Sequence, residues 1–121
     1  MDVELIVSLH SRVLFRRQEE VAARIALLAK DQRQDEANLL KAKRNVYGNL
    51  GDALAAFGRQ GHDVLNRYEE LMQHLDAVWN EAAELAARYQ DARRLAVEEV
   101  KLEALKDVMA LLREETREGE A

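Results

Sequence analysis

Proline and cysteine are both absent from this chain of 121 residues, and its hydroxyl side chains other than tyrosine are limited to Ser8, Ser11 and Thr116. A chain with so few turn-forming residues has little material for loops, which argues against β structure. The lack of cysteine excludes disulfide bonds and thiolate metal sites. Because aromatic residues reach only 5% of the composition, the core must be built mainly from Leu, Val and Ala.

Long apolar runs are missing as well. No stretch approaches the roughly 18 consecutive apolar residues of a membrane span. The amino terminus carries Asp2 and Glu4, where a secretory signal would carry basic residues. We therefore expect a cytoplasmic protein without a transmembrane segment.

The residues that are present favour helices. Apolar residues make up 48% and charged residues 34% of the chain, in an Ala, Glu, Leu and Arg-rich mixture that is typical of long helices and coiled coils. We expect residues 1–121 to form a single all-α domain. Its predicted architecture is an elongated antiparallel helical hairpin or small bundle with coiled-coil (heptad) packing.

The two halves of the chain differ in charge, although the whole carries a net charge of −5. Residues 1–60 contain ten Lys or Arg and eight Asp or Glu, a net of +2; residues 61–121 contain eight and fifteen, a net of −7. If the halves fold back on each other, basic side chains of the first face acidic side chains of the second. This complementarity favours pairing within the chain, or with a different surface, over pairing of like with like.

A regular apolar stripe runs through residues 54–96, with steps that alternate between three and four residues. Its members are Leu54, Phe57, Val64, Tyr68, Leu71, Leu75, Val78, Ala82, Leu85, Tyr89, Ala92 and Ala96, with Gly61 in its one gap. A second stripe, formed by Val7, Leu14, Val21 and Leu28, recurs every seven residues, and we expect Leu5, Ile6 and Leu9 to join it in the core. Both stripes predict helices that pack against other helices.

Two stretches interrupt these stripes. Residues 30–36 contain no apolar side chain, and the heptad phase changes across them, so we favour a turn or kink there. Gly58 and Gly61 flank a sequence that resembles a helix end followed by a new cap, which favours a reversal at residues 58–62. The alternative is a continuous helix, because the seven-residue spacing from Tyr47 to Ala96 passes through this stretch unbroken.

The expected helices therefore cover residues 2–30, 37–57 and 63–117. Asp2 is the predicted cap of the first helix. The third contains neither Gly nor Pro, and its stripe slips near Ala96, which predicts a local kink or a change of partner. Residues 118–121 have no apolar anchor and are expected to fray.

Few side chains offer chemistry. Glu70 and His74 lie one helical turn apart, but two acidic or imidazole ligands on one helix are a weak metal signal, and a solvated pair is the simpler interpretation. No cysteine, nucleophile elbow or phosphate-binding loop is present. We predict no enzymatic activity, no cofactor, no metal and no small-molecule substrate.

Residues 12–44 carry the strongest basic character, with nine basic and five acidic side chains, a net of +4. No aromatic platform accompanies them, and the chain as a whole is acidic, so we do not expect nucleic-acid binding. Within this stretch Arg17 and Arg24 continue a polar edge, which begins at His10 and ends at Asp31, with seven-residue spacing. This edge is either a partner-recognition edge or an ordinary solvated flank of the helix.

The aromatic residues give a sharper pattern, since Tyr47, Tyr68 and Tyr89 are spaced 21 residues apart on the same seam. We interpret them mainly as bulky core spacers, and Trp79 as the residue most typical of an interface. The predicted function is a non-enzymatic protein-protein interaction module, such as a structural subunit, adaptor or small chaperone, that binds other proteins or itself. The alternative is a dimeric, membrane-associated helical bundle that binds acidic lipid through residues 12–44. The candidate interface consists of Tyr47, Leu54, Phe57, Val64, Tyr68, Leu71, Leu75, Val78, Trp79, Leu85 and Tyr89.

Overall fold

Four α-helices run through residues 2–120, the part of the chain that the computed structural model describes. They are α1 (Val3–Lys30), α2 (Gln34–Gln60), α3 (Val64–Arg88) and α4 (Ala92–Glu120). No strand occurs within these described residues. The prediction of an all-α chain is therefore confirmed, and Asp2 caps α1 as expected by accepting a hydrogen bond from the Leu5 amide at 3.1 Å.

The first turn lies at residues 31–33, inside the polar stretch. Here Gln32 adopts a left-handed conformation with a φ of 62°, and the Arg33 amide donates to the carbonyl of Leu28 at 2.8 Å. The chain reverses completely at this point, which confirms the predicted turn. The following helix begins at Gln34, three residues before its predicted start at residue 37.

The second turn confirms the predicted reversal near the glycines. Gly61 ends α2 in the left-handed conformation with a φ of 87°, which an L side chain adopts only with strain. Gly58 remains inside the helix, and α2 therefore extends to Gln60 rather than to residue 57. Gly48 has a packing role instead, because a Cβ atom built there would lie 3.0 Å from the amide nitrogen of the Gln18 side chain on α1.

The third turn was not predicted, and the single helix expected over residues 63–117 is wrong. The chain turns at residues 89–91, where Gln90 has a φ of 56° and the Asp91 amide donates to the Ala86 carbonyl at 2.8 Å. The Asp91 carboxylate then accepts from the Arg94 amide at 3.1 Å and caps α4. A non-glycine residue in the left-handed region leaves no glycine signal, so the break appeared in the sequence only as the phase slip near Ala96.

Helix α4 extends to Glu120, three residues beyond the predicted helix end at residue 117. The fraying expected for residues 118–121 stays a prediction. Residue 121 lies outside the described residues.

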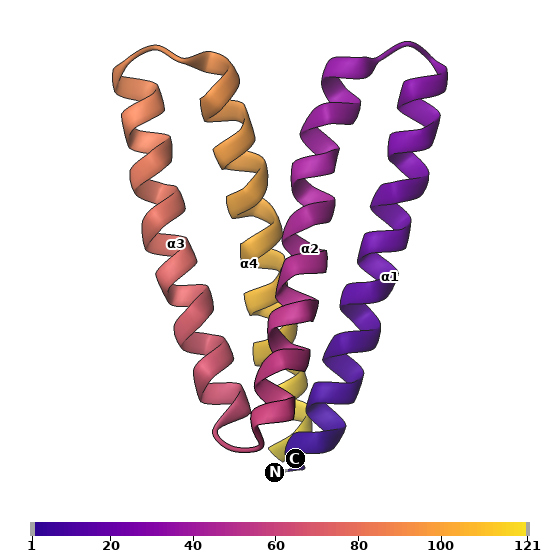
Figure 1. The fold of residues 1–121 in the computed structure, drawn as a ribbon, viewed down its shortest axis with the longest axis vertical. Coiled ribbons are helices and arrows are strands. Elements are labelled where there is room, and N and C mark those ends of the chain that lie inside the picture. The colour runs from indigo at the N-terminus through magenta and orange to yellow at the C-terminus, as the bar shows by residue number, and fades with distance from the viewer. Residues whose placement is uncertain (1, 121) are drawn as a thin grey trace.

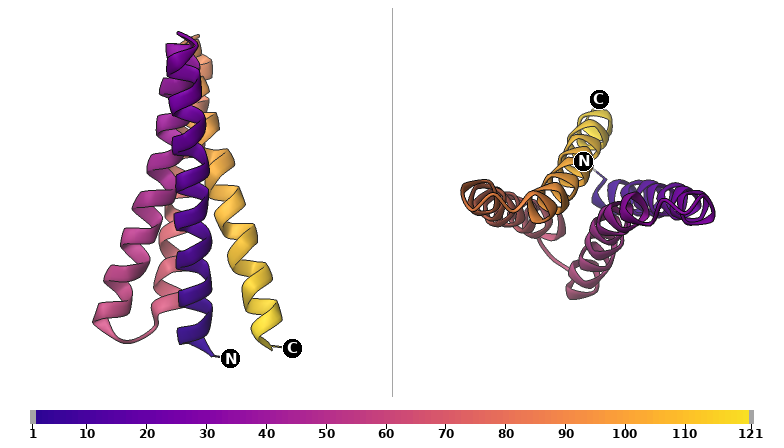
Figure 2. Two further views of the ribbon diagram at one scale, coloured as in Figure 1. Left: turned by 90° about the vertical axis from the view of Figure 1, so that its right-hand side faces the viewer. Right: turned by 90° about the horizontal axis from the view of Figure 1, so that it is seen from above.

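The helices form two antiparallel hairpins, α1 with α2 and α3 with α4, that meet in a V (Figure 1). In the view of Figure 1 the two hairpin turns at residues 31–33 and 89–91 lie far apart at one end, called the open end, while the start of α1, the end of α4 and the turn at residues 61–63 lie at the other, called the closed end. Between the hairpins the most extensive contact joins α2 and α4, which form the centre. Seen from above, α1 and α3 extend to opposite sides of the molecule (Figure 2).

The main core gathers side chains from all four helices. Its buried members are Ile6, Leu14, Val46, Tyr47, Leu50, Leu54, Tyr68, Met72, Ala104, Leu105, Val108 and Leu112. A separate small cluster of Ile25, Leu28 and Ala37 holds the tip of the first hairpin. Each large side chain that is fully buried contributes roughly 1.5–3 kcal/mol. The molecule is thus a small helical bundle, as predicted, whereas the regular heptad packing of a coiled coil stays a prediction.

Candidate functional site

Most of the candidate interface residues lie within the bundle. Tyr47, Leu54 and Tyr68 are buried in the main core. Five more are partly buried and pack against that core: Phe57, Val64, Leu71, Leu75 and Trp79. These eight side chains hold the four helices together.

The remaining three residues of the candidate interface lie on the surface of α3 and its end. Val78 is 44% exposed, Leu85 43% and Tyr89 75%. They continue the apolar stripe to which Leu71 and Leu75 belong, but towards the open end of the V, where the hairpins diverge (Figure 1). The stripe is therefore core at one end and free surface at the other.

The other exposed apolar side chains lie on α1. Phe15 is 64% exposed and Leu27 63%, and Val3, Leu5 and Leu9 are exposed as well. The expectation that Leu5 and Leu9 join the core is wrong, because both lie off the seven-residue row that contains Leu14 and Leu28 and faces the other helices. That offset was the signal in the sequence. Among the described residues, every exposed large apolar side chain is on α1, on α3, or on Tyr89, the C-cap of α3.

Exposed apolar and charged side chains lie together on two surfaces, one on α1 and one on α3. The α1 face consists of Leu5, Leu9, Arg12, Phe15 and Arg16, which share one side of the helix and are all exposed. The α3 face consists of Val78, Glu81, Glu84, Leu85 and Tyr89, which likewise share one side of the helix and are all exposed. Each surface combines apolar side chains with charges of one sign, basic on α1 and acidic on α3.

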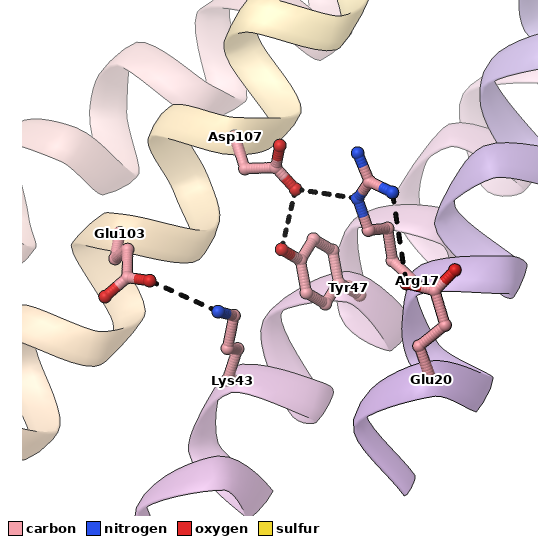
Figure 3. A network of polar contacts seen from close by, with 6 residues as sticks. All are labelled: Arg17, Glu20, Lys43, Tyr47, Glu103 and Asp107. Carbon is pink, nitrogen blue, oxygen red and sulfur yellow. Dashed lines mark hydrogen bonds and ion pairs between the residues drawn. The ribbon is translucent and has the colours of Figure 1, made fainter. Parts of the chain in front are cut away.

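A network of polar contacts joins α1 and α2 to α4 (Figure 3). Asp107 accepts two hydrogen bonds on the same oxygen, from Nε of Arg17 at 3.1 Å and from the Tyr47 hydroxyl at 2.7 Å. One turn away, Nζ of Lys43 lies 3.2 Å from a carboxylate oxygen of Glu103. These pairs join the basic half of the chain to its acidic half, as the charge distribution predicted.

The network shifts the pKa of two of its members. The hydrogen bond to Asp107 raises the pKa of Arg17, which stays fully charged. Burial first, and Asp107 second, raise the pKa of Tyr47, so its hydroxyl keeps its proton and donates. The arrangement fixes how α4 lies across the first hairpin, and its charges are occupied by one another.

A second polar cluster lies near the closed end, where His10 of α1 meets α3 and α4. The imidazole is completely buried, with Nε2 at 2.9 Å from the Tyr68 hydroxyl and Nδ1 at 2.8 Å from Oε2 of Glu115. Burial lowers the pKa of His10 to about 4. Burial raises the pKa of Glu115 to about 7, with smaller contributions from Glu114 and Glu118.

These contacts fix the role of each group. The ring is neutral near pH 7, and Tyr68, whose pKa is raised by burial, donates its proton to Nε2. The ring proton on Nδ1 is then donated to Glu115. His10 and Arg17 therefore turn the predicted polar edge towards α4, whereas Arg24 and Asp31 are exposed.

Trp79 is also part of the structural framework. It packs partly buried against the core, with Nζ of Lys101 4.6 Å above the centre of its ring, and Lys101 in turn lies 3.0 Å from Glu98. Together with Leu71 and Leu75 it lines a groove between α2 and α3. The interface role that the sequence suggests for Trp79 stays a prediction.

Glu70 and His74 are both exposed on α3. Within residues 2–120 no group of three or more His, Asp or Glu side chains is placed to hold a metal ion. The same described residues contain no helix with the length and apolar character to cross a membrane.

Comparison with known proteins adds no assignment. No protein-family model, no curated protein and no solved structure matches this chain.

Proposed function

We propose that this bundle is a non-enzymatic protein-protein interaction module that binds other helices through the exposed faces of α1 and α3. The observation that carries the proposal is the location of its exposed apolar side chains, which lie only on these two outer helices and the C-cap of α3 among the described residues. A structural subunit, an adaptor or a small chaperone would use such surfaces. A cytoplasmic location and coiled-coil packing against the partner belong to the same proposal.

The internal contacts support this proposal. The core joins all four helices, and hydrogen bonds within the chain join His10 to Glu115 and Tyr47 to Asp107. The scaffold therefore has its own stability, and the outer apolar side chains are not needed to complete it. Covering the exposed parts of Phe15 and one neighbour by a partner would contribute roughly 2–3 kcal/mol of binding free energy.

Site-specific photo-crosslinking in the native cells tests the proposal. A photoreactive amino acid would replace Phe15 on α1, Leu85 on α3 or, as a matched control, the exposed Lys41 on α2. We expect discrete protein adducts from the positions on α1 and α3 and none from position 41. If all three positions give no protein adduct, the proposed function is wrong.

The second candidate function is binding to acidic lipid through residues 12–44. The α1 face favours it, because Arg12 and Arg16 lie beside the exposed Leu9 and Phe15 in the pattern of an interfacial helix. Against it, Arg17 and Lys43 are already paired with acidic side chains of α4. Flotation with phosphatidylserine-rich vesicles at low salt separates the two functions, and we expect the protein to stay unbound.

A further inference from the structure

The two outer helices carry opposite charge. Helix α1 contains five Lys or Arg and three Asp or Glu, a net of +2, whereas α3 contains two and five, a net of −3. The α1 face carries Arg12 and Arg16 and the α3 face carries Glu81 and Glu84, while one exposed side chain of opposite sign lies beside each face, Glu19 on α1 and Arg88 on α3. None of the four charged side chains of the two faces takes part in an ion pair within residues 2–120.

The fold keeps these two complementary surfaces apart. Helices α1 and α3 lie on opposite flanks of the V, with α2 and α4 between them (Figures 1 and 2). Helices α1 and α3 are joined near the closed end through His10 and Tyr68, both buried. The α1 face and the α3 face of one molecule therefore cannot cover each other.

We propose that the partner is a second copy of this chain, and that the α1 face of one copy docks on the α3 face of the next. This inference rests on the proposed function and names the partner. Phe15 and Leu9 would pack against Val78 and Leu85, while Arg12 and Arg16 face Glu81 and Glu84. Both surfaces place apolar and charged side chains together on one side of a helix, as in two helices that pack side by side.

The charges decide in favour of this pairing over pairing of like faces. Two α1 faces in contact would bring four arginines together, and two α3 faces would bring four glutamates together; like charges across an interface are unfavourable. A lipid surface would match the α1 face but leave the α3 face uncovered. A second copy covers both surfaces.

The pairing is heterologous, since the two surfaces in contact differ. After the first contact, one copy has a free α1 face and the other a free α3 face. Association therefore continues into a ring or an open chain rather than stopping at a dimer. Sedimentation velocity of the full chain over a concentration series into the millimolar range should show species larger than a dimer. Because four charged side chains contribute, salt should weaken the association.

Two variants with one damaged face each provide the decisive test. L9Q/F15Q removes two of the three apolar side chains of the α1 face and leaves Leu5, and V78Q/L85Q removes two of the three of the α3 face and leaves Tyr89. These side chains are exposed, so both variants should keep the helicity and thermal midpoint of the wild type. We expect each variant alone to raise the apparent dissociation constant of self-association at least about tenfold. An equimolar mixture should form dimers and nothing larger, because only one intact α1 face and one intact α3 face can meet.

A charge exchange tests the same contact independently. R12E/R16E should abolish association, and so should E81R/E84R. A chain that carries all four substitutions should associate again, because the two surfaces are then complementary with exchanged signs.

Four outcomes would overturn the inference. One is a monomer at every concentration; another is self-association that L9Q/F15Q leaves intact, which would show α3 faces pairing with each other. The third is self-association that V78Q/L85Q leaves intact. The last is a monomer that binds phosphatidylserine-rich vesicles through Phe15. The proposed function has its own readout, since protein adducts at positions 15 and 85 that contain a different protein would support it while refuting self-association.

Discussion

The buried pair of His10 and Glu115 predicts an acid sensitivity that one substitution should reveal. The two groups respond to pH in opposite directions. The pKa of His10 is lowered from 6.5 to about 4, so its contribution to stability is complete above pH 6.5 and is lost as the pH falls towards 4. The pKa of Glu115 is raised from 4.5 to about 7, so its contribution is complete below pH 4.5 and is lost as the pH rises through 7.

The two contributions are of similar size. The difference between 6.5 and about 4 for His10 corresponds to about 3 kcal/mol, at about 1.4 kcal/mol for each pKa unit. The difference between 4.5 and about 7 for Glu115 gives about the same value with the opposite sign. In the wild type they cancel over this range, so the pair adds little pH dependence to the free energy of unfolding.

Replacing Glu115 with Gln removes one of the two contributions. The Gln amide oxygen can still accept the Nδ1 proton of His10, and the titration of the imidazole remains. Relative to the wild type, Glu115→Gln should lose about 3 kcal/mol of stability between pH 7.5 and pH 4. The measurement is urea unfolding of both proteins at a series of pH values, with the free energies compared at each pH.

The control is Glu99→Gln, a substitution at an exposed position of the same helix. It should follow the pH dependence of the wild type. Parallel pH curves for Glu115→Gln and the wild type would refute the reasoning, because they would mean that burial does not raise the pKa of Glu115 in the folded protein.

Four further substitutions test the turns and the polar network. Gly58→Ala should stabilise the protein by about 1 kcal/mol, because a Cβ atom at this position meets nothing within 4 Å. Gly61→Ala should destabilise it by about 1 kcal/mol, because Gly61 has a φ of 87°. Thermal unfolding of both variants checks this difference in sign. Tyr47→Phe removes a hydrogen bond to the charged Asp107 and should lower the free energy of unfolding, measured by urea unfolding, by about 1.5–3 kcal/mol. A loss below about 0.5 kcal/mol would contradict the described contact. Gln90→Gly relieves a left-handed residue with a φ of 56° and should raise the thermal midpoint; an unchanged or lower midpoint would argue against the third turn.

The turns differ in how strongly the sequence marks them. At residues 58–62 the glycines made the reversal predictable, because Gly61 adopts the left-handed conformation that other residues avoid. At residues 31–33 a run without apolar side chains and a change of heptad phase sufficed. At residues 89–91 the left-handed position is taken by Gln90, and Tyr89 continues the apolar spacing up to the turn itself. The residue types at residues 89–91 do not indicate a turn, so the sequence predicted one helix where the structure has two.

The distribution of charge along the sequence predicted more of the polar contacts than the sequence motifs did. The excess of base in residues 1–60 and of acid in residues 61–121 corresponds to the pairs of Arg17 with Asp107 and of Lys43 with Glu103. The partners of His10 were not predictable, because Tyr68 and Glu115 are 58 and 105 residues away in the chain. Only the tertiary arrangement brings them to one point.

The α3 stripe explains why the sequence could not separate core from interface. Its spacing is the same from Leu71 to Tyr89, so the pattern identifies one continuous face of a helix and says nothing about what covers it. The V shape supplies the difference, since α3 packs on the core at Leu71 and Leu75 and then leaves the first hairpin as the tips diverge (Figure 1). Val78, Leu85 and Tyr89 are exposed for that reason. The same geometry that withdraws a neighbour from the upper half of α3 therefore creates the surface to which we assign the binding of another copy.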